Sequence, residues 1–150
     1  MGWLSRNPVK TQPRIVERSS AVLPASTETP YFTVVGRVLI TQLVGEVTVI
    51  FDGTVNSIKL IANPTVGDDV DLCTALVVTD DVVGTFYNIT GTITDAMLVA
   101  TSGALTSQAD AILVADGTID LDATATDTTG STKWVLHYIP LDPDSSVVVA

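Results

Sequence analysis

The two side chains best suited to nucleophilic and base catalysis occur once each, as His137 and Cys73. A histidine acts as a general base and a cysteine thiolate as a nucleophile, but each needs a positioned partner group. His137 alternates with Trp134, Leu136 and Tyr138, so we expect it on the opposite strand face from those core residues. Cys73 lies in an apolar stretch with no neighbouring base, which predicts a small buried hydrophobe. The sequence therefore predicts no enzyme, no catalytic residue and no cofactor.

Aspartates are the next candidates, because carboxylate oxygens are ligands for Ca²⁺. They gather in three regions: Asp68, Asp69 and Asp71; Asp80 and Asp81; and Asp116, Asp120 and Asp122. No region has the D-x-[DN]-x-[DN]-G spacing of a calcium loop, so we predict a solvated acidic surface and no metal site, with Ca²⁺ binding by these loops left open. Asp120 and Asp122 lie two residues apart, so both are expected to face solvent, with Ile119, Leu121 and Ala123 facing inward.

A tryptophan and four basic side chains stand apart in an N-terminal segment that contains four prolines. They are Trp3, Arg6, Lys10, Arg14 and Arg18. Residues 1–30 show no sustained strand or helix period, so we predict an extended basic arm. An indole ring exposed beside cations favours an arm that binds a partner, and the alternative is a disordered tail that binds nothing.

The net charge excludes one large class of partner. Lys and Arg total 7 against 17 Asp and Glu, which gives a formal charge of −10. A body of this sign repels phosphates, so we predict no nucleic-acid partner. No apolar stretch approaches the roughly 18 residues of a membrane-spanning helix, so we predict no membrane partner either.

Hydrophobic periodicity predicts an all-β fold. Val, Thr and Ile are abundant, and β-branched side chains favour strands. Alternation with a period of two begins at Tyr31 and predicts about eight strands, over residues 31–41, 43–51, 54–61, 70–79, 85–93, 111–115, 118–126 and 132–139. Residues 94–110 fit either a short strand or a helical turn. The pattern predicts an antiparallel sandwich, jelly-roll-like rather than immunoglobulin-like, with an extended N-terminal arm.

Two Asp-Gly pairs predict the local pairing of four of these strands. Asp52-Gly53 separates the runs 43–51 and 54–61, and Asp116-Gly117 separates the runs 111–115 and 118–126. An Asp-Gly pair between two alternating runs is typical of a tight β-hairpin. We therefore predict one hairpin at each pair.

The chain is predicted to divide into an arm (1–30), a sandwich domain (31–140) and a C-terminal tail (141–150) that packs on the body or on a neighbouring subunit. Only 16% of the residues of the chain are charged, and its mean hydropathy is +0.42, so part of its surface must be apolar. Such a surface favours burial of apolar area between subunits, usually in a closed rotational assembly. The tail carries Val147, Val148 and Val149, which would be β-prone and adhesive if free in water, so we predict them at the subunit interface.

The stretches RVLITQLVGEVT, KLIANPT, DVDLC and GTIDLDATATDTTGSTKWVLHYIPL follow a basic arm in a short, acidic, Thr- and Val-rich chain. Over residues 31–142 the chain resembles the decoration proteins of tailed bacteriophage capsids, also called cement or head auxiliary proteins. The resemblance implies a homotrimer made in the host cytoplasm that sits on the outer capsid surface of the virion. There it would clamp neighbouring subunits of the major capsid protein, with the arm residues in contact with the capsid. The alternative is a glycan- or receptor-binding β module of a tail fibre or surface adhesin.

Overall fold

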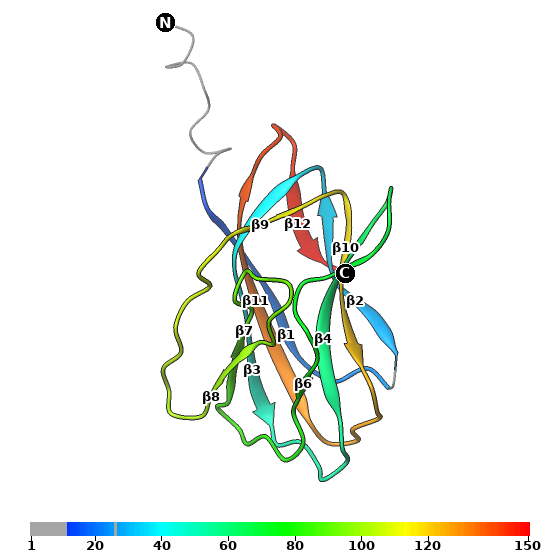
Figure 1. Cartoon of the computed structure of the whole chain (residues 1–150), viewed down its shortest axis with the longest axis vertical. Coiled ribbons are helices and arrows are strands. Elements are labelled where there is room, and N and C mark those ends of the chain that lie inside the picture. The colour runs from blue at the N-terminus through cyan, green and yellow to red at the C-terminus, as the bar shows by residue number, and fades with distance from the viewer. Residues whose placement is uncertain (1–11, 26) are drawn as a thin grey trace, which may run out of the picture.

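Two antiparallel β-sheets packed face to face make up the protein (Figure 1). The computed structural model describes residues 12–25 and 27–150. In these residues the strands are β1 (Arg14–Val22), β2 (Glu28–Val35), β3 (Val38–Val49), β4 (Ser57–Pro64), β5 (Val70–Asp71), β6 (Leu76–Val77), β7 (Phe86–Asn88), β8 (Leu98–Ala100), β9 (Ile112–Val114), β10 (Gly117–Ala123), β11 (Ser131–Pro140) and β12 (Ser146–Val149). Sheet A has the order β1-β11-β3-β7-β8 with β9 paired to β3, and sheet B the order β12-β2-β10-β4-β5 with β6 paired to β4. The predicted all-β antiparallel sandwich is confirmed, and its jelly-roll connectivity stays a prediction.

Alternating apolar side chains of the long strands build the core between the sheets. In β11, Trp134, Leu136 and Tyr138 face inward and are buried, whereas Val135 and His137 face outward and are partly exposed. Strand β3, which pairs with β11, repeats this alternation apart from a break at Thr41 and Gln42, and its register with β11 shifts at two places. Each fully buried aliphatic side chain stabilises the fold by about 1.5–3 kcal/mol. The predicted position of His137 opposite the core residues of its strand is confirmed.

Trp134 lies at the centre of the core and makes ring contacts across it. Its ring stacks on Tyr87 with centroids 6.4 Å apart, and it meets Tyr31 of sheet B edge-on at the same centroid distance. The Tyr87 hydroxyl donates a hydrogen bond to the Asp81 carboxylate, so the buried phenol keeps a polar partner. Gly45 lies opposite Trp134 in the sheet, and a Cβ there would come within 2.8 Å of the indole. A glycine at this position makes room for the ring.

Neither Asp-Gly pair forms the predicted hairpin. Asp52-Gly53 leads from β3 of sheet A to β4 of sheet B, and Asp116-Gly117 leads from β9 of sheet A to β10 of sheet B. The hairpin rule holds for strands that pair with each other, whereas these strands belong to opposite layers and share only the core. Both hairpin predictions were therefore wrong, because the chain changes sheet at these turns.

The folded body begins before residue 31, which corrects part of the predicted arm. Residues 14–22 form β1 at the edge of sheet A, paired to β11. The inward positions of this strand include Arg14 and Arg18, so its alternation is not one of apolar and polar residues. The predicted strand 31–41 is divided at Gly36, where a φ of +70° turns the chain from β2 in sheet B to β3 in sheet A. Residues 94–110, left open by the sequence, contain the short strand β8.

Candidate functional site

Of the five residues predicted to bind the capsid, the structure describes two, and Trp3, Arg6 and Lys10 lie outside the described residues. Arg18 projects inward from β1, and its guanidinium carbon lies 4.2 Å from the centroid of the Tyr31 ring. Its Nη1 donates a hydrogen bond to the Ala150 backbone oxygen at 3.3 Å. Burial raises the pKa of the Tyr31 phenol, and the nearby Arg18 charge partly opposes that shift. Arg18 therefore joins β1 of sheet A to the end of sheet B.

The C-terminal valines lie on a strand of the body. Residues 146–149 form β12, which pairs with β2 at the edge of sheet B. Val147 is 3% exposed and belongs to the core, so its predicted place in a subunit interface is wrong. Val148 and Val149 are 52% and 42% exposed. Pairing with β2 satisfies the backbone of a segment that would be adhesive if free, and the tail packs on its own body.

Three aspartates of the loops cap backbone N–H groups. Asp127 is buried, and its carboxylate accepts hydrogen bonds from the N–H groups of Asp52, Thr129 and Gly130 at 3.0, 2.9 and 2.6 Å. The Asp52 carboxylate in turn accepts bonds from Thr54 and Thr128. Hydrogen bonds to its charged form, chiefly from Thr54, lower the pKa of Asp52. These contacts tie the β3–β4 loop to the β10–β11 loop.

Asp116 also accepts hydrogen bonds that hold a turn, here the Asp116-Gly117 turn between β9 and β10. Its two oxygens accept hydrogen bonds from the Gly36 N–H at 3.0 Å and the Thr65 hydroxyl at 2.9 Å. The bond from Gly36 is the main reason that the pKa of Asp116 is lowered. Within the part of the chain that the structure describes, no three His, Cys, Asp or Glu side chains are grouped so that they could hold a metal ion.

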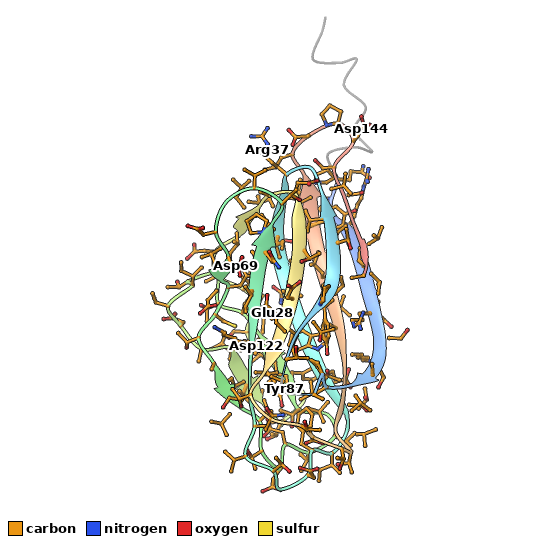
Figure 2. The ribbon with its side chains drawn as sticks, turned by 90° about the vertical axis from the view of Figure 1, so that its right-hand side faces the viewer. Glu28, Arg37, Asp69, Tyr87, Asp122 and Asp144 are labelled. Atoms are coloured by element: carbon orange, nitrogen blue, oxygen red, sulfur yellow. The ribbon has the colours of Figure 1, made fainter. Side chains whose placement is uncertain are left out.

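A group of acidic side chains lies on the outer face of sheet B. Asp120 on the central strand β10 is only 2% exposed, so the prediction that it faces solvent is wrong. It points away from the core as predicted, but neighbouring strands cover it, and Asn63 donates a hydrogen bond to its Oδ2 at 3.2 Å. Burial, a hydrogen bond to Asp120 and nearby negative charges, in that order, raise the pKa of Glu28. Figure 2 labels Glu28, Asp69 and Asp122 on this face.

Among the described strands of sheet B, this face holds one cation, Lys59. Lys59 Nζ lies 2.9 and 3.1 Å from the two carboxylate oxygens of Asp71, and the hydrogen bond raises the pKa of the amine. The ion pair is partly exposed, so its contribution to stability is small. Against Lys59 stand four carboxyl groups of the sheet B strands: Glu28, Asp71, Asp120 and Asp122.

His137 and Cys73 lie in different surroundings, the first on the outer face of a sheet and the second in the interior. His137 lies on the outer face of sheet A, between Ile15 of β1 and Gln42 of β3 in the strand register. No hydrogen bond or ion pair reaches its imidazole within the described residues. Cys73 is buried, its Sγ accepts a hydrogen bond from the Leu60 N–H at 3.4 Å, and burial raises the pKa of the thiol. The prediction of a buried cysteine is confirmed.

A hollow of about 190 Å³ opens on the outer face of sheet A, which the sequence did not predict. It is lined by Gln42, Val44, Phe86, Asn88 and residues 103–106. Side-chain amides hold the loop over the sheet: Asn88 Nδ2 donates to the Thr106 carbonyl at 3.0 Å, and Gln42 Oε1 accepts from the Gln108 N–H at 2.9 Å. Residues 94–110 show no hydrophobic period, so no sequence signal indicated that this loop folds back on the sheet.

Comparisons with known proteins do not place the chain in a family. No family model matches it, and neither the curated proteins nor the solved structures contain a match. The described residues also include no helix of the length and apolar character needed to cross a membrane. The fold is therefore an antiparallel β-sandwich that the comparisons assign to no family.

Proposed function

We propose that this protein is a structural virion protein of the capsid decoration class, which trimerises on the outer capsid surface and clamps neighbouring major capsid subunits. The observation that carries the proposal is that the reactive side chains are buried or cap turns, whereas many aliphatic side chains are exposed. Cys73 is buried, and Asp52, Asp116 and Asp127 cap turns, so these groups stabilise the fold. Aliphatic side chains, by contrast, are widely exposed on the strands and loops. A rigid body with this surface is suited to binding other proteins.

The clamping would come from the residues that precede β1. Trp3, Arg6 and Lys10 are in that segment, whereas Arg14 and Arg18 belong to the sheet. Three such segments in one trimer would bind successive capsid subunits at a high effective concentration, so modest contacts become durable attachment. A protein that binds only the mature lattice stabilises that lattice by mass action. The acidic face of sheet B would then face away from the capsid.

Deleting residues 2–11 tests the proposal, because the deletion leaves every described strand in place. Binding is measured by co-sedimentation with shells of the major capsid protein encoded in the same genome. We expect affinity for the shells to fall by about a hundredfold or more, since the attachment is multivalent. The control is Asp68→Ala, which removes one exposed charge of the body and should leave binding unchanged. Equal binding by the deleted and full-length chains would contradict the proposal.

A second candidate function is favoured by the hollow on sheet A. One partly exposed aromatic ring, Phe86, and the side-chain amide of Gln42 line it, and a ring beside an amide is suited to stacking and hydrogen bonding with a sugar. The protein would then be a glycan- or receptor-binding module. Such a module binds saccharides without any capsid, so a glycan array probed with the isolated protein separates the two functions.

A further inference from the structure

The outer face of sheet A carries a continuous row of aliphatic side chains around His137. We define the outer strip as Ile15, Leu39, Leu113, Val135, His137 and Ile139. In the register of the sheet, Ile15 of β1 lies opposite His137 of β11, Ile139 lies opposite Leu39 of β3, and Leu39 lies opposite Leu113 of β9. Directly opposed residues on one face of a sheet have neighbouring side chains. The strip therefore crosses four strands without a break.

The strip is exposed most at its two ends. Ile15 is 66% and Leu113 is 58% exposed, and the residues between them are partly exposed. Strand length and strand spacing put this face, from β1 to β9, on the order of 600 Å². A standard protein–protein interface buries about 800 Å² on each partner. The face thus supplies about three-quarters of a standard interface to a single neighbour, and less than half of one to each of two neighbours.

The distribution of charge favours the outer face of sheet A as the place where a second copy can approach. In the described strands of sheet A, the ionisable side chains on the outer face are Glu17, Glu46 and Lys133 besides His137, and Lys133 Nζ lies 3.0 Å from Glu46 Oε2. The outer face of sheet B carries four carboxyl groups and one lysine. In a chain with a formal charge of −10, two copies repel each other wherever acidic faces meet. The nearly neutral face of sheet A lets a second copy approach without that repulsion.

We propose that a second copy of this chain covers the outer strip, so that the Ile15 end of one copy packs against the Leu113 end of the next. In a threefold assembly the two ends of each strip contact different neighbours, which closes a ring of three. The proposal deepens the proposed function, on which it rests for the number of copies. The proposed subunit interface lies on sheet A, whereas the sequence analysis placed it at Val147, Val148 and Val149.

Charge substitutions at the two ends of the strip test the interface. Ile15→Glu and Leu113→Glu place a carboxylate in the apolar contact, so we expect either one to weaken self-association about a hundredfold or more. Mass in solution, by light scattering across a dilution series of the full chain, is the measurement. The matched control is Val66→Glu, at a loop valine that is 88% exposed and lies outside the strip. A wild-type monomer at every concentration, or equal masses for the strip and control variants, would overturn the inference.

Cysteine pairs give a second measurement that does not introduce charge. Positions 15 and 113 lie three strand spacings apart in one sheet, roughly 14 Å, so a disulfide between them within one chain is excluded. The double variant Ile15→Cys with Leu113→Cys should therefore form covalent links between copies under mild oxidation. The control pair, Val55→Cys with Val66→Cys, should stay unlinked. Equal linking of the two pairs would refute the proposed contact.

The two proposals fail in different experiments. A dimer that the strip variants dissociate would support the outer strip as the interface and would contradict the trimer of the proposed function. A trimer that the strip variants dissociate, but that does not bind capsid shells, would keep the interface and overturn the decoration function.

Discussion

At the scale of single residues, the most unusual group is the pair of carboxyl groups formed by Glu28 and Asp120. Asp120 is buried on the outer face of β10, where Asn63 donates to one of its oxygens. Glu28 stands at the start of the adjacent strand β2, and its raised pKa means that the folded protein holds the Glu28 proton to higher pH than the unfolded chain does. Stability from this group is therefore fully present below the ordinary glutamate pKa and is lost as pH rises through the raised value.

The substitution Glu28→Gln tests this pH dependence. A glutamine keeps the shape of a protonated glutamate and has no proton to lose, so the variant should lose less stability than the wild type between about pH 4 and pH 7. Urea unfolding midpoints across that range are the measurement. Glu17→Gln is the control, because it removes one carboxylate from β1, on the other sheet. Parallel pH profiles of the wild type and Glu28→Gln would show that the pair does not couple to folding.

At the scale of elements, the two Asp-Gly turns have identical sequence and different backbone surroundings. Gly117 has a φ of +151°, and a Cβ there would lie 2.2 Å from the Asn63 carbonyl oxygen and 2.6 Å from the Pro64 Cα. A Cβ at Gly53 would come no closer than 3.6 Å, to a side-chain oxygen of Asp80. The sequence rule treats both pairs as hairpins. The pairing of β10 with β4, which places Gly117 opposite Pro64, is what distinguishes the two turns.

We expect Gly117→Ala to destabilise the protein by about 2 kcal/mol or more, because the backbone of β4 would have to move. Gly53→Ala should stay within about 0.5 kcal/mol of the wild type, since its new methyl group meets ordinary contacts. Chemical denaturation of both variants gives the comparison. Equal losses would mean that the close approach at Gly117 does not constrain the turn.

At the scale of the whole molecule, Arg18 closes the seam between the two sheets on the side of β1 and β12. It stacks on Tyr31 and bonds to the Ala150 backbone, so one side chain of sheet A holds two segments of sheet B. A charged side chain that points inward on an edge strand also discourages pairing with other chains. An arginine that sequence reasoning assigned to a capsid contact thus stabilises the sandwich.

Arg18→Ala should destabilise the protein by about 1–2 kcal/mol, through loss of the cation–π contact and of packing by the arginine stem. The amides of β12 should also exchange faster with solvent. The comparison is Arg14→Ala, which removes an inward arginine of the same strand that does not stack on Tyr31. Unchanged exchange in β12 after Arg18→Ala would contradict a role in closing the seam.

The sequence by itself determined the all-β class and the buried faces of long strands such as β3 and β11, because alternation is a local property of a pleated chain. His137 was placed correctly for that reason, whereas the burial of Cys73, which lies between β5 and β6, followed from the apolar residues around it. The sequence did not predict β1, whose inward positions include arginines. Only the tertiary structure decided which strands pair, since an Asp-Gly turn serves equally for a hairpin or for a change of sheet. It also decided that Asp120 is covered and that Arg18 is internal, because both depend on strands distant in sequence. The outer strip likewise arises only when β1, β11, β3 and β9 align, which no local pattern specifies.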